Sequence, residues 1–298
     1  MDFVGEYAAN IRARLEASGY TVPNGLDRSA VCRLHLNLLR RRVPPVPRKV
    51  HIASEFSCPQ ELKPGLDLVL GKIESGQDLK PHLSRSFAKL EYHDMLLNDW
   101  GIHHLHLGTT LDPDGYVSRP KFGESLLFVR FTWDAAYLIA VLPHGSWARQ
   151  DFVRILHRNW PASIAVYRLD GVVGLAEPIT DEEIAEARNI KIDGQKKRAA
   201  LTHFVEVEPG VVYAPIGGGS SYSQMSCDAV SECDRIFDAL REYEHLVRQE
   251  VSGLVAEAKS RGLNVGDQLS FKLRRLGSAV VAIEESTMAV IGLPGRAI

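Results

Sequence analysis

A segment spanning residues 94–160 limits most strongly what this chain can fold into, because it predicts three consecutive strands and a helix. Alternating apolar and polar residues predict strands at 102–107, 126–133 and 137–142. The last two are joined only by Asp134, Ala135 and Ala136, which predicts an antiparallel hairpin. A helix from about 147 to 159 ends before Pro161, as a residue that precedes proline favours.

The residues before this segment predict a helical arm and the start of a sheet. Helical spacing extends over 3–18, and a second helix begins at Asp27 and ends in three arginines, followed by the proline-rich VPPVPRK. KVHIASEF then predicts a strand, and 60–75 and 79–90 predict helices. The expected order is therefore strand, helix, helix, strand, strand, strand.

The residues after Pro161 predict short strands, a glycine-rich loop and further helices. We expect strands at 163–169 and 172–176 around the Asp170-Gly171 turn, and an acidic helix capped by Thr180 with Glu183 at its third position. IGGGSS lacks the lysine and the glycine spacing of a nucleotide-binding loop, which predicts a mobile loop. A long helix over 227–261 and C-terminal strands complete the chain.

These elements predict an α+β protein in three parts. The parts are an N-terminal helical arm (1–47), a central antiparallel sheet with flanking helices (48–160), and a C-terminal α+β domain with one long helix (161–298). The chain has 298 residues, 45% of them hydrophobic and 24% charged, which is the balance of a globular protein rather than a disordered one.

Charge, cysteine content and hydropathy narrow the class of protein. The net charge of -2 excludes the global basicity of proteins that coat nucleic acid, so any such binding needs a local patch. The four cysteines form no CxxC pair, and the first residues lack the pattern of a secretion signal. No stretch approaches the roughly 20 apolar residues of a membrane span. We therefore expect a cytoplasmic protein without a membrane partner.

The element order of residues 48–160 resembles the RelE/ParE superfamily of small bacterial toxins. In that family a strand and two helices precede an antiparallel sheet whose second to fourth strands carry the functional side chains. The resemblance implies a ribosome-dependent endoribonuclease that uses Arg, His, Lys or Tyr instead of a metal. Toxins of this kind are near 100 residues and basic, whereas this chain is longer and slightly acidic.

The central strands carry the residues that this chemistry needs. His104 and His106 lie two apart on one strand, and Arg130 on the neighbouring strand is expected on the same face. With His144 they provide a base, an acid and a phosphate clamp for RNA cleavage, and either Trp147 or Trp133 is expected to stack on a splayed base. We expect no metal and no cofactor.

Two basic clusters are candidate contacts to RNA. Arg40, Arg41 and Arg42 end the second helix, where positive charge also suits the helix dipole of an ordinary solvated end. A second run is formed by Lys196, Lys197 and Arg198, which a solvated turn also explains.

Two alternatives to a metal-independent nuclease remain open. The His-x-His pair, with His144 and Asp94 or Asp99, provides ligands for a zinc or iron hydrolase, although no second such pair occurs. In the other alternative the histidines are structural, and the protein is a nucleic-acid or protein-interaction module of a mobile element.

The remaining expectations concern partners. If the chain is a nuclease of toxin type, its expected partners are RNA or the ribosome and an inhibitory protein that restrains its activity. The long helix carries apolar residues along one side, including Leu240 and Leu246, over about 50 Å at 1.5 Å per residue. This length predicts an interface, for example in a homodimer.

Overall fold

The computed structural model describes most of the chain and divides it into two compact units. One unit contains residues 1–35 and 231–298, and the other contains residues 36–230. The helices α2 (Arg28–Arg41) and α8 (Cys227–Ser260) pass from one unit to the other. The residues described are 1–119, 125–189, 191–192, 195–196, 203–221, 224–262 and 269–294.

A four-stranded sheet organises the unit of residues 36–230. Its order is β1-β4-β3-β2. The strands β2, β3 and β4 are antiparallel as predicted, whereas β1 pairs in parallel with β4, so the sheet is mixed. The bounds are β1 (Lys49–Ile52), β2 (Ile102–His106), β3 (Ser125–Phe131) and β4 (Ala135–Pro143).

The segment between β1 and β2 differs in part from the prediction. Residues 60–75 are helical as expected, as η1 (Gln60–Leu62) and α3 (Lys63–Ser75), and the helix ends at Gly76 with φ 69°. The predicted helix over 79–90 is wrong, because the chain there forms only η2 (Lys80–His82) and η3 (Arg85–Ala88). The Ser84 hydroxyl accepts a hydrogen bond from the Ser86 backbone and starts a new turn instead.

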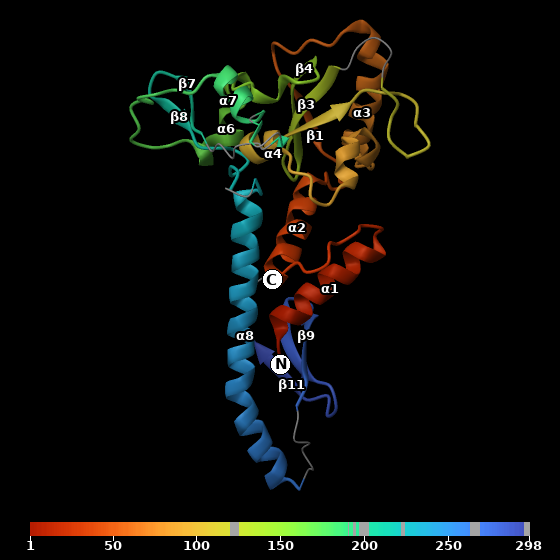
Figure 1. Ribbon diagram of the computed structural model, residues 1–298, viewed down its shortest axis with the longest axis vertical. Helices are drawn as coiled ribbons and strands as arrows, with labels where there is room; N and C mark the ends of the chain where they lie inside the picture. Colours follow the sequence, from red (N-terminus) through yellow and green to blue (C-terminus); the bar gives the residue numbers. More distant parts are fainter. Residues whose placement is uncertain are drawn as a thin grey trace. The chain divides into compact units, whose positions relative to one another are not determined.

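Apolar side chains cover the sheet on both faces. In Figure 1 the strands β1, β3 and β4 lie between α3 on one side and α6 (Pro161–Ile164) with α7 (Asp181–Ala187) on the other. Phe128 and Ile139 of the sheet form a core with Phe152 and Leu156 of α5 (Asp151–Asn159). Short turns precede and follow these helices, namely η4 (Ser146–Ala148) and η5 (Ala165–Tyr167).

The two strands predicted at 163–169 and 172–176 are wrong. Residues 163–167 form helical turns, because Pro161 occupies the first position of α6, where its missing N–H costs nothing. Residues 172–176 form no strand. The α7 helix begins with the predicted capping box between Thr180 and Glu183. Short strands follow, namely β5 (Lys191–Ile192), β6 (Gln195–Lys196), β7 (Val205–Glu208) and β8 (Val211–Tyr213).

The other unit combines helices with a small antiparallel sheet. The helix α1 (Phe3–Ala17) and the long α8 agree with the predicted bounds. The sheet has the order β11-β10-β9, with β9 (Phe271–Leu276), β10 (Ala279–Glu284) and β11 (Val290–Leu293). Buried residues of α8 include Phe237, Leu240 and Tyr243.

The predicted fold class is confirmed: the chain is α+β, with N-terminal helices, sheets flanked by helices and one long C-terminal helix. The division into three domains stays a prediction. Among the helices of the described residues, none combines the length and the apolar character needed to cross a membrane.

Candidate functional site

The register between β2 and β3 fixes the faces of the candidate catalytic residues. Ile102 is opposite Arg130, His104 is opposite Phe128, and His106 is opposite Leu126. Directly opposed residues of antiparallel strands share a face, so His104, His106 and Arg130 lie on one face, as the alternation predicts. Arg130 is the diagonal neighbour of His104, at a typical distance of about 7–8 Å. His103 lies on the other face.

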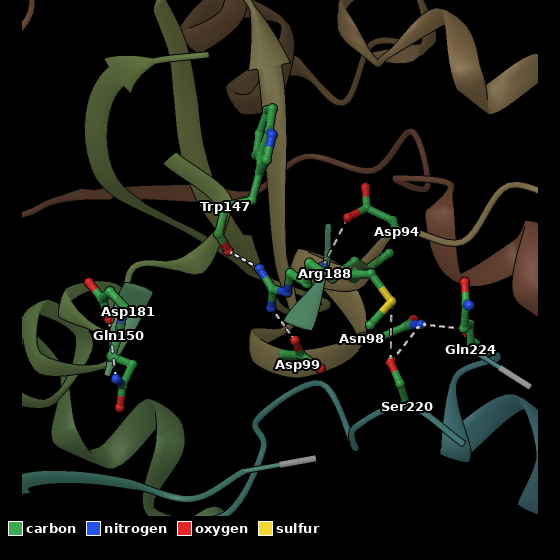
Figure 2. Close-up of polar contacts among 11 residues, drawn as sticks. Asp94, Asn98, Asp99, Trp147, Gln150, Asp181, Arg188, Ser220 and Gln224 are labelled. Atoms are coloured by element: carbon green, nitrogen blue, oxygen red, sulfur yellow. Dashed lines mark hydrogen bonds and ion pairs between the residues drawn. The ribbon is translucent and has the colours of Figure 1, made fainter. Parts of the chain in front are cut away.

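His104 faces a carboxylate from a short helix. Its side chain is 8% exposed, and Nδ1 lies 3.8 Å from Oδ2 of Asp94 without a hydrogen-bond partner in the described part of the chain. Burial lowers the pKa of His104, although the Asp94 carboxylate opposes this shift. Asp94 also caps α4 (Met95–Trp100) by accepting a hydrogen bond from the Leu97 backbone at 3.1 Å (Figure 2).

The predicted histidines come together around Trp147. The indole lies 4.7 Å from the His104 ring and 5.0 Å from the His144 ring, measured between centroids. The His104 and His106 rings are 6.3 Å apart. His106 is half-buried, and burial lowers its pKa to about 4, with further contributions from the charges of His104 and Arg119. All three imidazoles therefore occupy one site, with His144 at its exposed end.

Arg130 is the buried cation of this face. It is 8% exposed, and its Nη1 has no hydrogen-bond partner among the residues that the structure describes. The residue of β4 that lies opposite Arg130 is Tyr137. The Tyr137 ring stacks on the His51 ring, with 5.2 Å between their centroids. No described carboxylate pairs with this guanidinium, and an unpaired guanidinium is costly to bury, so this position favours an anionic ligand.

A buried ion pair holds the backbone of Trp147. Arg188 donates from Nη1 to the Trp147 carbonyl oxygen and from Nη2 to the Asp99 carboxylate, as Figure 2 shows. Burial raises the pKa of Asp99 to about 6, although Arg188 opposes the shift. The sequence carries no signal that joins Arg188 to Asp99, because 89 residues separate them. The position of Asp94 could be predicted more easily than the Arg188–Asp99 contact, because Asp94 and Gly101 are typical helix caps on either side of MLLNDW.

The IGGGSS segment packs against α4, and the mobility expected for it stays a prediction. Gly217 donates to the Asp99 carbonyl at 3.1 Å, and Gly219 donates to the Asn98 carbonyl at 2.8 Å. The Asn98 side chain donates to Ser220 Oγ and to the Gln224 carbonyl, both at 3.3 Å (Figure 2). The glycines thus permit close backbone packing.

The predicted basic contacts to RNA fall into three groups. Arg41 is buried at 4% exposure and donates to the Lys89 and Leu90 carbonyls, which corrects its expected place on the surface. Arg40 pairs with Asp228 and donates to the Gly217 carbonyl at 2.7 Å, while Arg42 is exposed. Lys196 ends β6, and Lys197 and Arg198 lie outside the described residues.

No set of three His, Cys, Asp or Glu side chains in the described residues has the geometry of a metal site. The comparisons with known proteins give no match: no family model, no curated protein and no solved structure matches the chain.

Proposed function

We propose that the chain is an RNA-directed, metal-independent endoribonuclease of toxin or phage-defence type. The observation that carries the proposal is the diagonal placement of His104 and Arg130 on one sheet face, each with a buried nitrogen that lacks a described hydrogen-bond partner. The proposal includes the resemblance of residues 48–160 to RelE/ParE toxins. Its support is the element order, in which a strand and helices precede three antiparallel strands.

The proposed base is His104. Burial keeps its imidazole neutral at pH 7 by lowering its pKa, and a general base needs the neutral form. With Nδ1–H directed at Asp94, Nε2 takes the proton of the RNA 2′-hydroxyl. The 2′-oxygen then attacks phosphorus, and the bond to the 5′-oxygen breaks. The products are a 2′,3′-cyclic phosphate and a 5′-hydroxyl.

The other roles follow from position. The Arg130 guanidinium holds the phosphate, whose charge rises in the transition state. His144 is exposed beside Trp147 and returns a proton to the 5′-oxygen. His106 lies beside His104, and the indole of Trp147 stacks on a neighbouring base. As a toxin-like nuclease, the protein acts on RNA or the ribosome in the cytoplasm and is restrained by an inhibitory protein.

A second candidate, the non-catalytic interaction module, is favoured by the burial of the strand histidines. Burial lowers the pKa of His103 and of His106 to about 4, which is what neutral packing residues require. This candidate predicts that replacing His104 changes stability without changing any reaction.

The test is cleavage of labelled RNA, free and ribosome-bound, by the full chain in EDTA. The proposal predicts cleavage with cyclic-phosphate ends and a loss of about 10²–10⁴-fold for His104→Ala and His144→Ala. Arg130→Lys also loses activity, because lysine keeps the charge but not the planar fork that grips two phosphate oxygens.

His245→Ala is the matched control, since His245 is an exposed histidine of α8. Activity that EDTA abolishes and zinc restores would instead support the metal-dependent hydrolase. Binding of RNA without cleavage, with the folded His104→Ala protein unchanged, would support the interaction module.

A further inference from the structure

The unit of residues 1–35 and 231–298 contains a cavity of about 180 Å³ that the RNA chemistry does not use. Its walls come from α1, α8 and the β9–β10 hairpin. The lining residues are Phe3, Glu6, Tyr7, Asn10, Leu240, Leu273, Arg274, Arg275 and Val280.

The wall from α1 is one face of the helix. Phe3, Glu6, Tyr7 and Asn10 are spaced by three, one and three residues, so they follow one side of the helix. Phe3 is buried, as is Leu240 from α8. The cavity is therefore lined by buried apolar residues together with the polar side chains of Glu6 and Asn10.

The charged groups at the cavity form no close ion pairs with described residues. Glu6 has no ion pair within 4.0 Å there, and burial raises the pKa of its carboxyl group against the charges of Lys272 and Arg274. Arg274 donates to the Leu273 carbonyl at 3.0 Å, and Arg275 donates to the Gly277 carbonyl at 3.2 Å. No ion pair joins either arginine to a described carboxylate. One carboxylate and two guanidiniums thus border the same apolar space.

We propose that this cavity binds a free α-amino acid with an apolar side chain. A cavity of about 150 Å³ holds benzene, so the space here accepts a phenyl or branched alkyl group. The ligand carboxylate pairs with the guanidinium of Arg275, which lies on the same face of the hairpin as the lining residues Leu273 and Val280. The ligand ammonium pairs with Glu6, which a simple carboxylic acid leaves without a partner.

The experiment is calorimetric titration of the full chain with three ligands that share a phenyl group. L-Phenylalanine carries both charges, 3-phenylpropionate lacks the ammonium, and phenethylamine lacks the carboxylate. We expect L-phenylalanine to bind at least tenfold more tightly than either analogue. Glu6→Gln should reduce its affinity to that of 3-phenylpropionate, and Arg275→Gln to that of phenethylamine.

Two further variants keep the result decisive. Val280→Phe fills the cavity and should abolish binding, while Arg261→Gln, at an exposed arginine that follows α8 and lies outside the lining, should bind as the parent does. The proposal is overturned if L-phenylalanine and L-leucine do not bind. It is also overturned if 3-phenylpropionate binds as tightly as L-phenylalanine, or if Glu6→Gln and Val280→Phe leave the affinity unchanged.

Discussion

Arg188 holds Trp147 in the histidine cluster by donating a hydrogen bond to its backbone carbonyl oxygen. The same guanidinium neutralises Asp99, which is buried at 1% exposure. The geometry of the cluster therefore depends on a buried ion pair. Breaking such a pair leaves a buried charge without compensation.

Arg188→Met is expected to lower the free energy of unfolding by about 3–5 kcal/mol, because it leaves the Asp99 carboxylate buried and unpaired. Urea denaturation followed by circular dichroism measures the loss. Adding Asp99→Leu should recover most of it, since the double variant buries no charge. Arg149→Met is the control, because Arg149 forms an exposed pair with Asp151 at 3.9 Å. Equal effects of the Arg188 and Arg149 changes would contradict the prediction.

Periodic patterns predicted the fold where they were long or closed by caps. The extents of α1 and α8 and the Thr180 capping box follow from local sequence alone. The strands predicted at 163–169 and 172–176 failed because a few apolar residues around Gly171 fit a strand and a helical turn equally well. Pro161 favours the helical turn, because proline is well suited to the first position of a helix.

The candidate site was predictable only in part. Strand alternation placed His104 and Arg130 on one face, because faces depend on period and register alone. The contact of Arg188 with Asp99 and the packing of Gly217 on α4 join residues far apart in sequence, which local patterns do not encode. Arg41 was misplaced for a related reason, since backbone carbonyls near η3 compete with solvent for its guanidinium.

Gly217→Ala should destabilise the protein more than any gain in backbone entropy offsets. An added Cβ would lie 2.1 Å from the Leu97 carbonyl oxygen and 2.4 Å from that of Asn98, so the backbone must shift. We expect a loss of about 1–3 kcal/mol, as in overpacked cores. Gly71→Ala in α3 is the matched control, where no atom lies within 4 Å and a gain of about 0.5–1 kcal/mol is expected. Thermal denaturation of both variants decides the sign.

The predicted homodimer is best tested at the far end of α8. Leu240 cannot serve, because it is 2% exposed and a charge there would unfold its own unit. Leu254 is 37% exposed. If a second copy covers this end of the helix, light scattering should give a dimer mass for the parent chain and a monomer mass for Leu254→Glu. Glu250→Gln is the control. A monomer mass for the parent chain at high concentration would refute the homodimer.

The protein should lose stability as the pH falls from about 6.5 to about 4. Burial lowers the pKa of His103 and of His106 from 6.5 to about 4, so in this range the unfolded chain holds protons that the folded protein excludes. Asp99 acts in the opposite sense, because burial raises its pKa to about 6 and the folded state keeps that proton. Burial also lowers the pKa of His82 and His104, and it raises that of Glu6. Four histidines therefore outweigh two carboxyl groups, and the net slope has the sign of the histidines.

The slope identifies the groups responsible. Near pH 5 each such histidine contributes about 1.4 kcal/mol per pH unit to the free energy of unfolding. His106→Asn should therefore reduce the measured slope by about that amount, whereas His245→Asn, at an exposed position of α8, should leave it unchanged. Urea denaturation at several pH values from about 4.5 to about 6.5, which lie within the range over which His106 shifts, measures the slope for each variant. A stability that is flat or rises toward pH 5 would show that the strand histidines are protonated in the folded protein.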